Sequence, residues 1–144
     1  RGKQVIRLFI AVALAGLVAL ASRFVDRRRA SHPLVVRRGA LPTQVPAVEV
    51  GLGVGPAIIS FTELTCRSCQ DAISLIRGPA GGGIPVADIE YGAQPELHKR
   101  FDIDTVPTTV VVDDKGSVVA GWTGRIDLRE LTVALAQVVQ SDPD

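Results

Sequence analysis

Residues 57–77 read AIISFTELTCRSCQDAISLIR, and this stretch decides the fold. Its first five residues are an apolar run that follows Gly55-Pro56, which predicts a short buried strand. The part from Cys66 to Arg77 predicts a helix, because a Gly-Pro pair follows it directly. The two cysteines of the chain, Cys66 and Cys69, therefore lie where a buried strand passes into a helix.

This position of the cysteines favours redox chemistry. The thiolate is the reactive form of cysteine, and the unpaired N–H groups and the dipole of a helix N-terminus stabilise it. Arg67 adds a positive charge, and the spacing places Cys69 one helical turn further on, within reach of a disulfide. We therefore expect Cys66 to attack and Cys69 to resolve. The alternative is a pair of buried structural thiols or a static disulfide.

The rest of the pattern predicts a mixed sheet with helices packed on its faces. We expect a strand at 86–91, a short helix at 95–101, a hairpin of 108–112 with 117–121, and a last helix. Asp127 and Glu130 resemble a capping box at the start of that helix. One apolar face of the helix is expected to contain Leu128, Leu131, Leu135, Val138 and Val139.

Residues 57–140 resemble the thioredoxin superfamily. The resemblance rests on IISFTELTCRSC (58–69), on FDIDTVPTTVVVDDKGSVVAGWTG (101–124) and on the order of the elements. It implies an α/β thioredoxin-like domain at 57–144 and a cis Val106–Pro107 bond facing the cysteines, which also suits a proline before a β-branched strand. The substrate groove that it implies is formed by Arg67, Val106, Pro107 and Thr108.

Several positions depart from thioredoxin itself. Thr65 stands where thioredoxin has a tryptophan, and Arg67-Ser68 stand in place of Gly-Pro. Ser60 occupies the place of a buried acid that helps the second cysteine to exchange its proton, and Glu63 is a candidate to replace that acid. The resemblance is nearest to membrane-anchored, extracytoplasmic thioredoxin-like proteins, which are usually tied to a particular partner.

The two histidines raise the alternative of a metal site. A thioredoxin-like copper chaperone would use two cysteines and one histidine, for which His32 and His98 are the candidates. We expect His98 on the surface of its short helix, and the spacings match no common zinc pattern. We therefore expect neither a metal nor a cofactor.

The first 25 residues predict a transmembrane anchor. Leu8–Ala21 contains no charged residue, and 5–25 can span a bilayer if Arg7 and Arg23 reach the headgroups. A secretory signal peptide is the alternative, because a basic start, an apolar run and small residues are typical of one. The chain starts with Arg and contains no Met, so we expect its natural start upstream.

Charge is divided unevenly along the chain. Nine of the sixteen Lys and Arg residues precede residue 41, and fourteen of the fifteen Asp and Glu residues follow it. Residues 26–56 are thus expected to be a basic collar, suited to anionic headgroups, and a Pro/Gly-rich tether. The acidic body, with few aromatic residues, argues against a nucleic-acid partner.

Two arguments on membrane orientation conflict. Three Lys or Arg residues precede the apolar run and six follow it closely, which favours a cytoplasmic body. The export-like start and the redox pair favour the opposite side, and we expect a single-pass protein with its domain outside the cytoplasm. Two functions stay open: a thiol–disulfide oxidoreductase acting on a protein thiol or disulfide, and a non-enzymatic accessory subunit of a membrane protein complex.

Overall fold

The computed structural model describes Arg1, Gly16 and residues 41–140. Apart from Arg1 and Gly16, the predicted anchor and the basic collar lie outside the described residues. Within the part of the chain that is described, no helix has both the length and the apolar character that a bilayer span needs.

Within residues 41–140, four strands form one mixed sheet in the order β2-β1-β3-β4. The central strand β1 (Ala57–Thr62) runs parallel to β2 (Val86–Glu90) and antiparallel to β3 (Thr108–Val112). β4 (Val118–Thr123) forms a hairpin with β3. β1 and β3 are buried on both faces, which explains why both read as nearly continuous apolar or β-branched runs.

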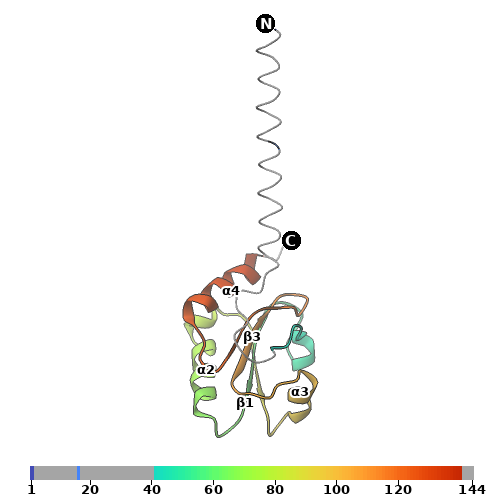
Figure 1. Cartoon of the computed structure of the whole chain (residues 1–144), viewed down its shortest axis with the longest axis vertical. Coiled ribbons are helices and arrows are strands. Elements are labelled where there is room, and N and C mark those ends of the chain that lie inside the picture. Colours follow the sequence, from blue (N-terminus) through green and yellow to red (C-terminus); the bar gives the residue numbers. More distant parts are fainter. Residues whose placement is uncertain (2–15, 17–40, 141–144) are drawn as a thin grey trace. The chain divides into compact units, whose positions relative to one another are not determined.

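Helices cover both faces of the sheet (Figure 1). α2 (Arg67–Arg77) and α4 (Leu128–Gln140) pack on one face. The short α3 (Pro95–Arg100) and the 3-10 helix η1 (Ala47–Val50) pack on the other, and a further 3-10 turn, η2 (Pro79–Gly81), follows α2. These elements confirm the predicted mixed sheet flanked by helices, with ends displaced by one or two residues.

The alternation of side chains along β1 sets the place of the polar residues near the cysteines. Ile59 and Phe61 point into the core beneath η1 and α3, whereas Ile58 belongs to the core beneath α2 and α4. Successive residues of a strand face opposite sides, so Ser60 and Thr62 face α2 together with Ile58. The two hydroxyls therefore lie on the sheet face from which α2 starts.

Residues 41–56 differ from the predicted tether, because several of their apolar side chains pack in the core of the domain. Val45 is fully buried, and Ala47 and Val50 pack in the same core as β1 and β3. The Val45 N–H donates to the carbonyl oxygen of Gly116 at 2.7 Å, in the hairpin turn. Gly116 has φ +77°, and an added Cβ would lie 2.6 Å from the Cα of Pro46, so this approach requires glycine.

The last helix is capped as predicted but exposes part of its predicted apolar face. Asp127 Oδ1 accepts from the N–H groups of Arg129 and Glu130 at 2.8 and 3.1 Å. The Glu130 carboxylate accepts from Nε1 of the buried Trp122 at 2.9 Å. The buried residues of α4 are Leu131, Ala134, Leu135 and Val138. Leu128 and Val139, at the two ends of the helix, are exposed.

Candidate redox site

Cys66 and Cys69 form a disulfide at the start of α2, with their Cα atoms 5.3 Å apart. Cys66 is the N-cap of the helix, and only three residues separate it from the end of β1. The strand is buried between β2 and β3, so it holds the first turn of α2 at one edge of the sheet.

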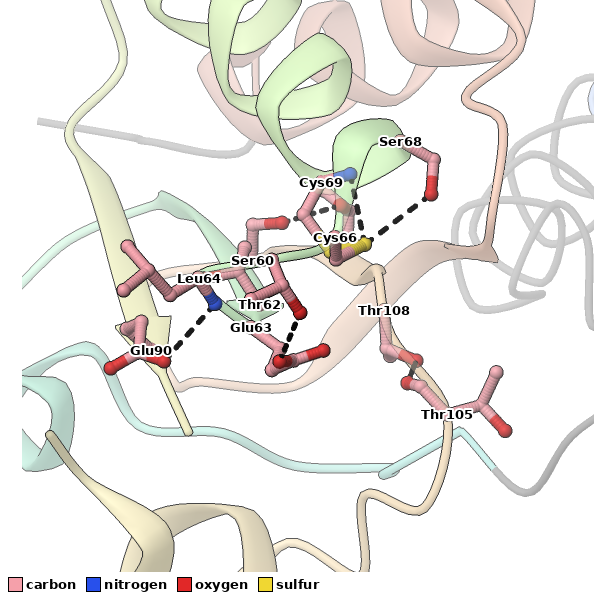
Figure 2. Close-up of a disulfide and its surroundings, with 12 residues drawn as sticks. Ser60, Thr62, Glu63, Leu64, Cys66, Ser68, Cys69, Glu90, Thr105 and Thr108 are labelled. Carbon is pink, nitrogen blue, oxygen red and sulfur yellow. Dashed lines mark hydrogen bonds between the residues drawn. A yellow bond between two sulfur atoms is a disulfide. The ribbon is translucent and has the colours of Figure 1, made fainter. Parts of the chain in front are cut away.

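Donors converge on the sulfur of Cys66 (Figure 2). The backbone N–H of Cys69 donates to the Cys66 Sγ at 3.2 Å, and the Ser68 hydroxyl lies 3.4 Å from the same sulfur. Cys66 is half-buried and Arg67 is exposed beside it. These donors and the N-terminus of the 11-residue helix are suited to stabilise negative charge on the Cys66 sulfur.

The two cysteines differ in access to solvent. Cys69 is only 2% exposed, whereas Cys66 keeps accessible surface. An incoming sulfur can therefore reach Cys66 more readily than Cys69, and attack at the accessible sulfur sets the order of exchange.

The loop before β3 lies at the same edge of the sheet as the disulfide, because Phe61 of β1 pairs with Thr108. The Val106–Pro107 peptide bond is cis. The Pro107 carbonyl oxygen accepts from the Gly124 N–H at 2.7 Å, and the Thr108 hydroxyl donates to the Thr105 carbonyl at 2.6 Å. Of the predicted groove residues in this loop, Val106 keeps partial exposure, whereas Pro107 and Thr108 are buried.

Two buried hydroxyls occupy the sheet beneath the start of α2. The Ser60 and Thr109 oxygens lie 2.9 Å apart, and both residues are fully buried. They are cross-strand partners in the β1–β3 register. One hydroxyl donates its hydrogen bond to the other, so both buried hydroxyls have a partner. A neutral hydrogen-bonded pair therefore stands where the resemblance implies an acid.

A cavity of about 250 Å³ lies beside Cys69. Among the described residues, three acidic ones line it: Glu63, Asp88 and Glu90. Glu63 accepts from the Thr65 hydroxyl at 2.6 Å, in the exposed loop that leads to Cys66. Glu63 thus reaches the cavity next to Cys69, although its hydrogen bond ties it to the loop.

Glu90 fixes the loop before the disulfide. Its Oε1 accepts from the N–H groups of Leu64 and Gly92 at 3.2 and 2.9 Å, and its Oε2 accepts from the Ala93 N–H at 2.8 Å. The hydrogen bond from Gly92 is the main cause that holds the pKa of Glu90 below its usual value, with further contributions from Ala93 and Leu64. The carboxylate therefore serves as a backbone clamp.

Asp88 lies one strand away from Ser60 at the same height, because the two residues pair in the parallel β1–β2 register. Its Oδ1 accepts from the Thr62 hydroxyl at 2.6 Å, and its Oδ2 lies 3.6 Å from Arg77 of α2. The Asp88 side chain is 28% exposed. Asp88 was not among the predicted site residues, although a charged residue between the apolar Ala87 and Ile89 of an expected strand was a signal.

An open groove of about 970 Å³ lies on another side of the helix start. It runs between the first turns of α2 and the loop that joins β4 to α4. Its polar lining comes from Ser68, Asp71, Arg125, Asp127 and Arg129. Ser68 connects this groove to the Cys66 sulfur, so a segment of a bound protein could extend from the sulfur into the groove.

His98 corrects the expectation of a surface histidine. It is 2% exposed, its Nε2 lies 2.8 Å from the Ile89 carbonyl oxygen, and its ring packs edge-on against Phe61 and Tyr91. It lies on the η1 and α3 side of the sheet, whereas the cysteines begin the helix on the opposite side. No group of three or more potential metal ligands occurs within residues 41–140.

Comparisons with known proteins bear on the fold. No protein-family model and no curated protein matches the sequence. Thioredoxin 1 from the thermophilic eubacterium Thermosipho africanus matches in structure with a TM-score of 0.51 and 19% identity, covering 58% of this chain and 94% of its own. Thioredoxin from Malassezia sympodialis has a TM-score of 0.49 and 21% identity, over 74% and 97% of the two chains.

The fold follows from the strand order and the first of these matches. A mixed sheet in the order β2-β1-β3-β4, with helices on both faces and a Cys-x-x-Cys disulfide at a helix start, is thioredoxin-like. At such low identity the likeness extends to the fold alone. The chemistry of the protein has to be argued from its own residues.

Proposed function

We propose that this protein is a thiol–disulfide oxidoreductase, held at a membrane by its N-terminal segment and acting on a protein outside the cytoplasm. The observation that carries the redox part is the Cys66–Cys69 disulfide at the start of α2, with one accessible and one buried sulfur. Thioredoxin-like architecture around such a pair supports thiol–disulfide exchange.

In this proposal the exchange begins at Cys66. When the pair is reduced, the Cys66 thiolate attacks a disulfide of the partner and forms a mixed disulfide, while one partner sulfur leaves as a thiolate. Cys69 then attacks the Cys66 sulfur, which restores the intramolecular disulfide and releases the second partner sulfur. In the opposite direction, a partner thiolate attacks Cys66 and Cys69 leaves; a second partner thiolate then attacks the partner sulfur of the mixed disulfide, which forms the partner disulfide and releases the Cys66 thiolate. The Cys69 N–H and the Ser68 hydroxyl support charge on Cys66 in both directions.

The first test separates the two cysteines by their reactivity. In the reduced full chain we expect Cys66 to be alkylated much faster than Cys69 at neutral pH, because Cys69 is buried. A Cys69→Ser variant should hold the mixed disulfide with a partner protein, since it has no resolving thiol. The matched control, Cys66→Ser, should trap far less. Equal and slow alkylation with no trapped species would contradict the proposal.

The second test is the reduction potential of the pair. Redox-active members of this class span from about −270 to about −120 mV, whereas structural disulfides have potentials below about −300 mV. We expect a value inside the active range when the protein is equilibrated with dithiol buffers. A value below it would favour the other function, a non-enzymatic accessory subunit of a membrane complex with a static disulfide.

The membrane part of the proposal rests on the apolar stretch Leu8–Ala21 and the basic residues that follow it. After mild reduction of intact cells, we expect a membrane-impermeant maleimide to label Cys66. Cys66→Ser provides the background. Labelling that appears only after lysis would place the domain in the cytoplasm, with a cytosolic protein as its partner.

A further inference from the structure

The buried sulfur of Cys69 needs an acceptor for its proton. In the exchange proposed above, on which this inference rests, Cys69 keeps its proton while Cys66 is joined to the partner. The proton must leave before the sulfur can attack, because the thiolate is the nucleophile. Cys69 is 2% exposed, so bulk water has poor access to it. A base that faces the same space beside the sulfur would speed this step.

The cavity beside Cys69 provides that space. Its volume of about 250 Å³ exceeds the share of several water molecules, which is about 30 Å³ each in the liquid. Thr62 and Asp88 line it together with Cys69, and they are hydrogen-bonded to one another at 2.6 Å. Water in the cavity would thus have polar partners on the strand side and the Cys69 thiol on the helix side.

The three carboxylates around the cavity are not equivalent. Glu90 accepts from three backbone N–H groups, which favour its charged form and make it a weak base. Glu63 accepts from Thr65 within the exposed loop, so its position follows that loop. Asp88 projects from the regular part of β2 on the face covered by α2, paired in register with the buried Ser60. Its position relative to the helix start is therefore set by the sheet.

We propose that Asp88 accepts the proton of Cys69, through water in the cavity, when Cys69 displaces the partner from Cys66. The S–H bond of Cys69 breaks and the proton passes to the Asp88 carboxylate. The electron pair left on the Cys69 sulfur forms the bond to the Cys66 sulfur. The bond between Cys66 and the partner sulfur breaks, and the partner leaves as a thiolate. In the reverse direction, Asp88 returns the proton to Cys69 as it leaves.

Polar and charged groups surround the Asp88 carboxylate. The Thr62 hydroxyl donates to it at 2.6 Å and Arg77 lies 3.6 Å away, while Glu63 and Glu90 line the same cavity. The Asp88 side chain is 28% exposed, so water in the cavity can reach its carboxylate.

The test follows the two sulfur steps separately. The reduced full chain is mixed with a symmetric aromatic disulfide whose released thiolate is coloured. The first thiolate appears when Cys66 attacks, and the second appears when Cys69 resolves. At about pH 7 we expect Asp88→Asn to slow the second release by about a hundredfold, the lower end of what general-base catalysis contributes, and to leave the first unchanged. Asp88→Glu should recover much of the rate.

The pH dependence distinguishes a proton acceptor from a structural residue. As the pH rises, hydroxide can take the Cys69 proton in place of Asp88, so the rate of Asp88→Asn should approach that of the wild type at high pH. The matched control is Asp114→Asn in the hairpin turn at the far edge of the sheet, which should change neither release.

Each contrary outcome is specific. Equal rates of the second release in wild type and Asp88→Asn at every pH would overturn the assignment while leaving the exchange intact. Equal slowing of both releases would reduce Asp88 to a structural residue. Slowing of the second release by Glu63→Gln instead would transfer the role to Glu63. A wild-type chain that never gives the second release would overturn both this inference and the proposed exchange.

Discussion

Val45→Ala tests whether residues 41–56 are part of the folded domain. Val45 is fully buried in the core that β1, β3 and η1 share. Val48, three residues further on, is 56% exposed in the same segment. The same substitution at the two positions therefore removes the same atoms from two environments, which makes Val48→Ala a matched control.

The expected cost follows from the burial of the two side chains. Val45→Ala removes two buried carbons, and at about 0.8 kcal/mol per buried methylene the lost transfer free energy is about 1.6 kcal/mol. The cavity left behind raises the loss of unfolding free energy to about 2–3 kcal/mol. Val48→Ala should change the free energy by less than about 0.5 kcal/mol, as exposed substitutions usually do.

Urea unfolding of the full chain, with the disulfide oxidised in every variant, measures this difference. With a slope near 2 kcal/mol per molar, about 2 kcal/mol corresponds to a midpoint roughly 1 M lower for Val45→Ala than for Val48→Ala. Equal midpoints would contradict the place of Val45 in the core, because the segment before residue 57 would then be a tether that contributes nothing to stability.

Three further predictions concern other polar or constrained positions. Because the pKa of Glu90 is lowered in the folded protein, its carboxylate stabilises the fold fully above the ordinary pKa of 4.5. This stabilisation is lost as the pH falls through the lower pKa of the folded state, and Glu90→Gln should flatten this part of the stability–pH curve in urea titrations. Gly116→Ala should lower the free energy of unfolding by at least about 1 kcal/mol, because φ is +77° and Pro46 lies against the added Cβ, and thermal unfolding measures it. Ser60→Ala alone should cost about 1–3 kcal/mol by leaving the Thr109 hydroxyl unpaired, whereas Ser60→Ala with Thr109→Val should cost less; a larger loss in the double variant would contradict a closed hydroxyl pair.

The regular elements could be predicted because their signals are local. The apolar run at 57–61 and the β-branched run at 108–112 appear as β1 and β3 with almost the expected bounds. The helix after the cysteines also begins and ends within a residue of its expected limits. The position of Cys66 at the helix start follows from the same local pattern, so half of the redox site could be found without any knowledge of packing.

Positions that depend on packing could not be read from the sequence in the same way. The Pro and Gly residues between 41 and 56 suggested a tether, although apolar residues occur among them. Val45 is a core residue because it packs against the sheet face that β1 and β3 present to η1. His98 stands among charged residues, which suggested the surface, yet its side of the short α3 packs against Phe61. In both cases the deciding contact joins segments that are distant in the sequence.

The relation between Ser60 and Asp88 shows what such distant pairing can do to a site. Because the two residues are in register on neighbouring parallel strands, the acid Asp88 on β2 lies level with Ser60 and one strand to the side of it. The surroundings of the two positions differ. Ser60 is fully buried, while the Asp88 side chain is 28% exposed and faces both Arg77 and the cavity. An acid at the position of Asp88 is thus accessible to water in the cavity and to a bound partner, whereas an acid at the position of Ser60 would be enclosed between the sheet and α2.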